Sequence, residues 1–572
     1  MKKKVKYKKQ QRLFEQKTNA VINVMTFGFF IVMTSVFPMF LTHEKYLKIT
    51  YPKALFFWIL TAAAAVSIFF VFVFFKKSLA VRNYYVENEP ARRVSFAEWA
   101  LLAFIGFSFI SAAAASSNEA FASNLYATPR VKDVVWLGYT DRYEGFISFL
   151  CYGLTFFIIA RFYKPKRLHL LIFAGSSTLI SVYGILQFLG IDIFGLFPFT
   201  FKDFIGSDGK SIYGPLSTHF RTTLGNIDIV SAYCAFTVVL FAALFSVSSV
   251  SRDKSKWQIL YIAASAVTFA LHLIAGRDAS KVGILGAMVL LIPYWISNRE
   301  RLGKILLVLS SWCVVYICYD CYLSALKKQY ELNPSGFALL DQYFLASYKP
   351  GNTILFAALA VFLVAAGLCL LILLKKWAER PMKIAGIAFL PAAFVIGILF
   401  VLIMGARWSD DPYNIIWQAR EILHGRLDDH FGSNRGWIWK SGFSVLFKHP
   451  FLGTGPDTFL YALGDHLQSQ AVAFTGVVFD KAHNIFLQIA VCMGIPALLA
   501  YAAFIGGVFV PAVKKAFERP LLLAFGAAAL SYTAQSFFCV EVPITTPLVW
   551  VALGVMAGEI RREKIGLQES EI

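Results

Sequence analysis

The chain has 572 residues, of which 58% are apolar, 16% are aromatic and only 15% are charged, whereas about a quarter of the residues in an ordinary soluble domain are charged. These proportions and a mean hydropathy of +0.62 exclude a soluble globular enzyme, because one anchor helix of about 20 residues would barely move the mean of so long a chain. The sequence therefore predicts an all-α protein, a polytopic helical bundle that crosses a membrane many times.

The net charge of +20 would suggest nucleic-acid binding in a soluble protein. Here the positions of the charges matter more than their sum, and we expect no nucleic-acid partner. The eight cysteines lie in or beside apolar segments, which predicts buried thiols rather than disulfides. Cys318 and Cys321 form a C-x-x-C pattern, but no second pair completes a metal site, so we expect no bound metal.

Apolar segments long enough to cross about 30 Å of hydrocarbon follow one another along the chain. The first is too long for a signal peptide and lacks a small-residue cleavage site, so we expect it to be retained. We expect about fourteen transmembrane helices, near residues 19–42, 54–75, 97–117, 145–160, 168–188, 227–247, 257–275, 282–297, 305–323, 353–374, 384–405, 483–509, 520–539 and 545–558.

Lysine and arginine set the predicted orientation. With a cytoplasmic N-terminus, the short connections on the inner side carry 33 of the 54 Lys and Arg residues, and the positive-inside rule then places both termini in the cytoplasm. The predicted organisation is a basic cytoplasmic head, eleven helices, a large external loop, three more helices and a cytoplasmic tail, at residues 1–18, 19–405, 406–482, 483–558 and 559–572.

The external loop at 406–482 is the longest polar connection. Long loops outside a compact bundle are usually either functional or disordered. Within this one, residues 414–423 and 435–448 carry apolar side chains at helical spacing, which predicts two short amphipathic helices that lie flat at the membrane interface. A cap that packs on the bundle without any catalytic part is an open alternative.

The sequence contains none of the soluble nucleotide-binding or zinc-protease patterns, G-x-x-x-x-G-K-[ST], G-x-G-x-x-G after a strand, or H-E-x-x-H, which argues against an ATP-driven pump. Ion-coupled transporters place ionisable side chains at mid-membrane. His272 and Asp320 are the best candidates here, and both are expected toward the outer half of their spans. We interpret them as local hydrogen-bonding groups.

Ionisable residues gather instead at the external ends of the predicted helices, namely Arg221, Arg277, Arg435 and His483. If they converge, they form an anion-binding pocket with one titratable base, because guanidinium groups bind phosphate oxygens in pairs and stay charged. For each arginine taken alone, an anchor at the membrane interface is the favoured interpretation. His483 opens a helix, where the helix dipole favours the neutral imidazole that a general base needs.

The segment HNIFLQIAVCMGIP resembles the His-Asn-x9-Gly-x-x-Gly signature of the bacterial O-antigen ligase and O-antigen polymerase family. Upstream, RGWIWKSGFSVLFKHPFLGTGPDTF is similar to the family's Arg-Gly-x-x-Trp followed by His-Pro-x-x-Gly-x-Gly-Pro. RTTLGN at 221–226 and Gly276-Arg277 add weaker similarity, so the likeness covers roughly residues 140–560. Ala497 replaces the second signature glycine and fourteen spans exceed the usual twelve of the ligases, which weakens the choice of ligase over polymerase.

The resemblance implies a metal-independent, inverting glycosyltransferase that needs no cofactor and faces the outside of the bacterial cytoplasmic membrane. It would transfer a glycan from a polyprenyl pyrophosphate carrier to a glycan or lipid acceptor. Carried over by position, His483 would be the base, and Arg221 and Arg435 would bind the pyrophosphate with Arg277 beside them. Secondary candidates for the site are Asp228, Asn484 and Arg142.

A lipid-linked oligosaccharide flippase or another multi-span transporter is the main alternative. A transporter of this size often has internal repeats and charged residues around a mid-bilayer cavity, and the sequence has no obvious repeat. The sugar, the acceptor and the choice between ligase, polymerase and protein-glycosylating enzyme stay open.

Overall fold

The computed structural model describes residues 21–75, 94–116, 130–196, 221–248, 255–334, 337, 339–373, 378–407 and 414–564, and within these ranges every regular element is a helix. The expected basic head at 1–18 and most of the expected tail lie outside the described residues. The predicted all-α class is therefore confirmed for the part of the chain that is described.

Long apolar helices make up the bundle. The N-terminal segment Val21–Met39 includes a π-helical stretch, Val32–Val36, and α2 (Phe37–Met39). The other helices of the bundle are α3 (Thr50–Phe75), α6 (Phe96–Ser116), α8 (Phe146–Phe162), α9 (Arg167–Phe188), α10 (Ile227–Val247), α11 (Ile259–Ala275), α12 (Asp278–Leu290), α13 (Ile292–Ser297), α14 (Arg299–Leu332), α16 (Thr353–Leu368), α17 (Glu379–Ala406), α21 (Ile485–Lys515), α22 (Pro520–Ser536) and α23 (Thr546–Lys564).

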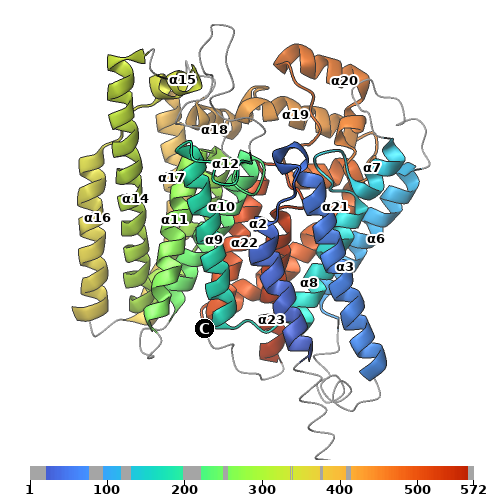
Figure 1. Ribbon diagram of the computed structural model, residues 1–572, viewed down its shortest axis with the longest axis horizontal. Helices are drawn as coiled ribbons and strands as arrows, with labels where there is room; N and C mark the ends of the chain where they lie inside the picture. The colour runs from blue at the N-terminus through green and yellow to red at the C-terminus, as the bar shows by residue number, and fades with distance from the viewer. Residues whose placement is uncertain are drawn as a thin grey trace, which may run out of the picture.

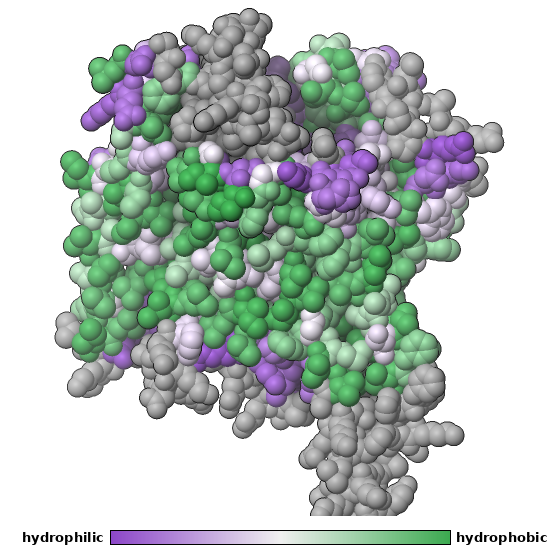
Figure 2. All heavy atoms as spheres, viewed as in Figure 1, coloured by the Kyte–Doolittle hydropathy of each residue, from purple (hydrophilic) through white to green (hydrophobic). Residues whose placement is uncertain are grey.

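Each of the fourteen expected segments coincides with helix in the structure. Ten of them meet the length and hydropathy of a membrane span, and the other four coincide with α8, α11, α22 and α23, which are shorter or more polar. Figure 2 shows a hydrophobic band across the face in view, with hydrophilic residues above and below it. The chain is thus a polytopic membrane protein, and its described residues contain ten candidate spans by these criteria.

The bundle is built around α10, whose most apolar window is 94% buried and which packs against α11, α12, α14 and α22. The helices α16 and α17 are the opposite case. No residue in the most apolar window of α17 is buried, and only 17% of the residues in the corresponding window of α16 are buried. A helix that is apolar on all sides needs either protein or lipid around it. Other helices of the protein surround α10, whereas α16 and α17 need lipid around them.

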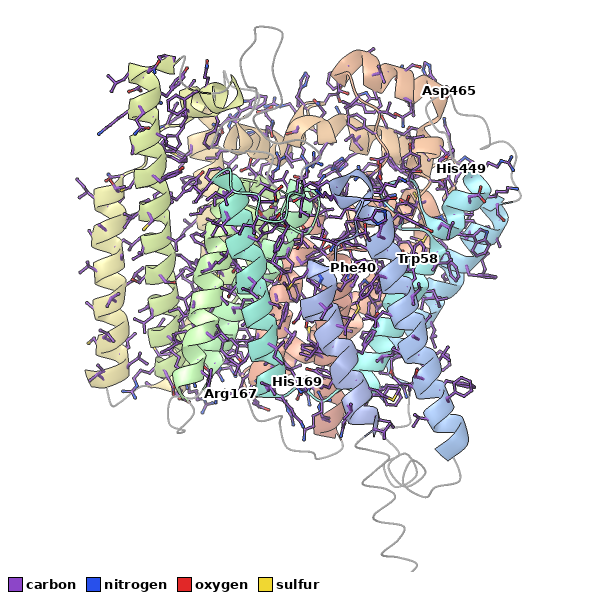
Figure 3. The ribbon with its side chains drawn as sticks, in the orientation of Figure 1. Phe40, Trp58, Arg167, His169, His449 and Asp465 are labelled. Atoms are coloured by element: carbon purple, nitrogen blue, oxygen red, sulfur yellow. The ribbon has the colours of Figure 1, made fainter. Side chains whose placement is uncertain are left out.

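Three helices lie across one end of the bundle and form what we call the cap, residues 414–482 (Figure 1). They are α18 (Ile415–Leu423), α19 (Phe431–Leu446) and α20 (Phe459–Thr475). The first two coincide with the helices predicted in the large loop, whereas α20 was not expected. Figure 3 places His449 and Asp465 at the cap end and Arg167 and His169 at the opposite end. The short helices α7 (Val131–Leu137) and α15 (Leu339–Ser347) lie at the cap end too.

Candidate active site

A cavity of about 1020 Å³ lies where the cap meets the bundle. Its walls come from α10, α12, α17, α18, the start of α19, the residues before α21 and the end of α22. Its polar end joins side chains that are far apart in the sequence: Asp228, Ser231, Arg277, Asp278, Gln418, Ser433, Arg435, His483 and Gln535.

Part of the cavity is apolar and follows two membrane helices. The apolar side chains that α12 and α17 contribute are Val282, Val289, Leu290, Leu390, Ala393, Phe394, Ile398 and Val401, and the cap helices α18 and α19 contribute others. Leu290 is twelve residues beyond the start of α12 at Asp278, a distance of about 18 Å along the helix at 1.5 Å per residue. The cavity therefore runs from a charged end beside the cap into the hydrophobic band.

His483 lies at the charged end in a constrained conformation. Its φ of +49° is in the left-handed region, which residues other than glycine seldom adopt. The Nδ1 atom is buried and has no hydrogen-bond partner among the described residues. Burial and then the nearby Arg435 guanidinium lower the pKa of the imidazole to about 4. The ring is therefore neutral near pH 7, and burial is the largest cause of the lowered pKa.

Neighbouring residues hold His483 in place on both sides. The Asn484 side chain caps α21 by accepting a hydrogen bond from the Leu487 N–H at 3.1 Å, so this residue has a structural role. On the other side, the Ala482 carbonyl accepts a hydrogen bond from the Trp439 indole at 3.1 Å, and the Ala482 N–H donates to the Gln488 side chain at 2.8 Å. A strained backbone persists only where its surroundings fix it in this way.

The glycines of the two family-like motifs meet in one piece of packing. Gly494 breaks α21 with a φ of +87°, and this frees backbone carbonyls of the preceding turn. Residues 449–455 fill the break: the Thr454 and Gly455 N–H groups donate to the Val491 and Cys492 carbonyls at 3.2 and 2.7 Å. Side chains would not fit there, since a Cβ added to Gly453 would lie 2.4 Å from the backbone of Cys492.

Two residues before His483, Lys481 is the centre of a buried ion cluster. Its Nζ lies 2.7 Å from Glu144 and 2.5 Å from Asp457, and all three side chains are at most 3% exposed. Burial lowers the pKa of Lys481, but the two carboxylates outweigh it and the pKa is raised. Asp457 also accepts hydrogen bonds from the backbone of residues 139 and 144 at 2.7 and 3.1 Å. The cluster thus ties the His483 segment to the loop before α8.

Arg142 belongs to the same region but already has a partner. Its guanidinium makes two hydrogen bonds to Asp480, at 2.6 and 3.2 Å. Burial raises the pKa of Asp480, but Arg142 outweighs burial and the pKa is lowered. This bidentate pair reinforces the link between the loop before α8 and the segment before α21.

Two of the predicted arginines, Arg435 and Arg277, line the cavity together with His483. The Arg435 guanidinium donates to the Phe538 carbonyl at 2.8 Å and to the Gly432 carbonyl, which fixes its plane. Arg277 pairs with Asp228 at 2.9 Å, and both side chains are about half exposed. Burial lowers the pKa of Arg435, but a guanidinium stays charged in proteins.

Arg221 lies elsewhere at the cap end. It precedes α10 and its guanidinium lies over the Tyr46 ring, 5.7 Å from the ring centre. The backbone N–H of Arg221 donates to the Gln187 side chain at 3.3 Å. Arg221 is not among the residues that line the cavity.

The two mid-membrane candidates form local hydrogen bonds, as the sequence analysis proposed. His272 Nδ1 lies 3.1 Å from the Ser280 hydroxyl, which accepts a hydrogen bond at 2.6 Å from Ser231 in the cavity wall. Asp320 accepts hydrogen bonds from Tyr348 and from the Gly351 N–H, the latter at 2.7 Å. Ser280 also donates to the Arg277 carbonyl at 2.8 Å. The contacts of Ser280 with His272, Ser231 and Arg277 therefore fix the turn that carries Arg277.

Among the described residues, no group of three or more His, Cys, Asp or Glu side chains is arranged to hold a metal ion. The eight cysteines are free, in agreement with the expectation of thiols. Only five of them are buried, however, because Cys318, Cys321 and Cys369 lie on exposed faces of α14 and of the helical segment after α16.

Three important residues were missed by sequence reasoning. Lys481 and Asp457 flank the two motifs, and a lysine in so apolar a stretch is itself a signal of a buried partner. Gln535 lines the cavity from α22, and no pattern in the sequence distinguishes it from an ordinary amide within a helix.

The fold and the cavity define a polytopic membrane protein with a charged site between a helical cap and the bundle, continued by an apolar channel. Residues 356–502 match the model of the O-antigen ligase family, so this segment, from α16 into α21, is an O-antigen ligase domain. The match includes Arg435, the 449–455 loop and His483, and is narrower than the 140–560 suggested by the motifs. The family acts in lipopolysaccharide biosynthesis and implies a glycan transferase. No curated protein matches the chain.

Proposed function

We propose that the protein transfers a glycan from a polyprenyl pyrophosphate carrier to an acceptor hydroxyl, as an O-antigen ligase or polymerase. One observation carries this proposal: a single cavity joins a neutral histidine and two arginines to an apolar channel along α12 and α17. A polyprenyl pyrophosphate has the matching form, with a dianionic head and a long hydrocarbon chain. The reaction requires no ATP, because the anomeric phosphate bond is already activated.

In this reaction His483 is the general base. The acceptor O–H gives its proton to the imidazole, the acceptor oxygen bonds to the anomeric carbon, and the bond from that carbon to the pyrophosphate oxygen breaks with its electron pair. Attack from the face opposite the leaving group inverts the anomeric centre. A positioned base contributes about 10² to 10⁴ in rate, and the lowered pKa of His483 supports the role because it keeps the ring neutral.

The arginines stabilise the leaving group. Arg435 and Arg277 lie at the charged end of the cavity, where their guanidinium groups bind pyrophosphate oxygens as charge develops on them. Arg435 has its Nε and one terminal nitrogen on backbone carbonyls, so the orientation of its fork is set before the substrate arrives. Arg221, Arg142 and Asp228 remain predictions as binding residues. Arg142 and Asp228 are in ion pairs with Asp480 and Arg277, and Arg221 is not among the residues that line the cavity.

We further propose fourteen spans with both termini in the cytoplasm, which places the cap and the cavity mouth at the outer face of the bacterial cytoplasmic membrane. The distribution of lysine and arginine supports this orientation. Cysteine-accessibility labelling tests it in intact cells: a cysteine introduced at exposed Lys440 of the cap should react with an impermeant maleimide. Labelling only after cell lysis would reverse the orientation.

The function is tested with purified protein, a polyprenyl pyrophosphate-linked glycan and an acceptor glycan or lipid. Product should form without ATP or an ion gradient, and His483→Ala should abolish it while the protein remains in the membrane at wild-type abundance. A transporter would instead move the lipid-linked glycan across vesicles without forming product. Wild-type product formation by the His483→Ala protein would refute the catalytic role of this histidine.

A further inference from the structure

We propose that Gln535 binds substrate, by donating a hydrogen bond from its carboxamide to the carrier-side phosphate of a polyprenyl pyrophosphate. The identity of this ligand rests on the proposed function. The placement of Gln535 does not, because it follows from the cavity and its hydrogen bonds alone.

Gln535 is a buried amide that lines the cavity, and its donor has no oxygen or nitrogen partner among the described residues. It lies in the last turn of α22, its side chain is 1% exposed, and it lines the same cavity as His483 and Arg435. Its Nε2 is buried and has no hydrogen-bond partner among the described residues. The Cys539 thiol, which also lines the cavity, is within side-chain hydrogen-bonding reach of Gln535, but sulfur is a weak acceptor and leaves most of the amide's hydrogen-bonding capacity unused.

Such a donor loses its hydrogen bonds to water on folding and gains at most a weak contact with sulfur in return. Most buried polar side chains in folded proteins do have a partner, so the exceptions call for an explanation. Other buried amides of this protein follow the rule: Gln468 Nε2 donates to the Phe479 carbonyl at 2.8 Å. A ligand oxygen in the cavity would complete the hydrogen bonding of Gln535 in the same way.

The depth of Gln535 indicates which part of the ligand it contacts. It lies against Gly283 of α12, where an added Cβ would come within 3.2 Å of the Gln535 Cβ and 2.4 Å of the Ser531 carbonyl. Gly283 is five residues beyond Asp278, or about 7 Å deeper along the helix than the arginine end. Gln535 thus lies between the two arginines and the apolar channel, and the phosphate joined to the hydrocarbon chain occupies that boundary in a bound carrier.

The experiment measures binding of polyprenyl pyrophosphate without a glycan to the purified full-length protein, together with thermal unfolding. For Gln535→Met we expect the Kd to rise about tenfold or more, the size of one lost hydrogen bond to a charged group. The same variant should unfold at the wild-type temperature or above it, because it removes an unpaired donor. In the control Gln468→Met, which removes a paired donor, the unfolding temperature should fall.

The outcomes separate the possible roles of Gln535. An unchanged Kd for Gln535→Met overturns the inference. The Gln535 amide would then contact the sugar or no ligand at all. A lower unfolding temperature would overturn it too, because the amide would then be paired within the protein. Cys539→Ser should keep the wild-type Kd, and a rise equal to that of Gln535→Met would assign the effect to the thiol. Binding by a wild-type protein that forms no glycan product would reject the proposed function and leave the inference standing.

Discussion

Replacing Lys481 by methionine removes the only cation of a cluster whose three side chains are at most 3% exposed. Glu144 and Asp457 then lack the cation between them, and Asp457 keeps only its backbone hydrogen bonds. Removal of one partner from a buried ion pair costs about 3–5 kcal/mol, far more than the pair contributes over neutral groups of the same shape. We expect Lys481→Met to lower the stability of the purified protein by that amount and to displace His483, two residues away.

The assay is thermal unfolding in one detergent, followed by tryptophan fluorescence. The control is Lys440→Met, the same substitution at an exposed cap lysine that pairs with Asp429 at 2.7 Å, where the cost is about 0–1 kcal/mol. A triple variant, Lys481→Met with Glu144→Gln and Asp457→Asn, removes all three charges and should recover most of the loss. If Lys481→Met unfolds at the same temperature as Lys440→Met, the cluster does not fix this segment and the reasoning fails.

Three further predictions concern the site and its packing. The rate of transfer should be constant from pH 5 to 8 and fall below about pH 4, the pKa of His483, because protonated imidazole accepts no proton; initial rates that fall already at pH 6 would contradict this. Arg435→Lys should lower kcat/KM by about 10², since an ammonium replaces neither the bidentate fork nor its backbone anchors, whereas Arg426→Lys at an exposed ion pair should not. Gly453→Ala should lower the unfolding temperature more than Gly464→Ala, because both have positive φ but a Cβ meets the backbone of α21 only at Gly453.

The sequence was sufficient to locate the membrane helices, because a span must be continuously apolar. Their ends were less predictable. The helix expected at 305–323 runs from Arg299 to Leu332 in α14, since its last turns are polar and continue beyond the hydrophobic band without any break. α20 was missed because its apolar residues are interrupted at Gly464, where the helix bends.

The motif residues of the site were identifiable, but their contacts were not. Lys481 and Glu144 are 337 residues apart, and only the packing of α8, α21 and the cap brings them together. The same applies to Asn484, which precedes an apolar run and reads equally well as a substrate ligand or a helix cap. For Gln535, the informative fact is a missing partner, and this can be recognised only when every neighbour has been placed.

One wall of the cavity belongs to α17, a helix with no buried residue in its most apolar window. On that side of the cavity, lipid rather than protein therefore packs against the outer face of α17. A 28-residue helix is about 42 Å long, which exceeds a hydrocarbon core of about 30 Å and so makes its tilt sensitive to membrane thickness. The width of the channel, and with it the affinity for the proposed long-chain substrate, then depends on the surrounding lipids as well as on the protein.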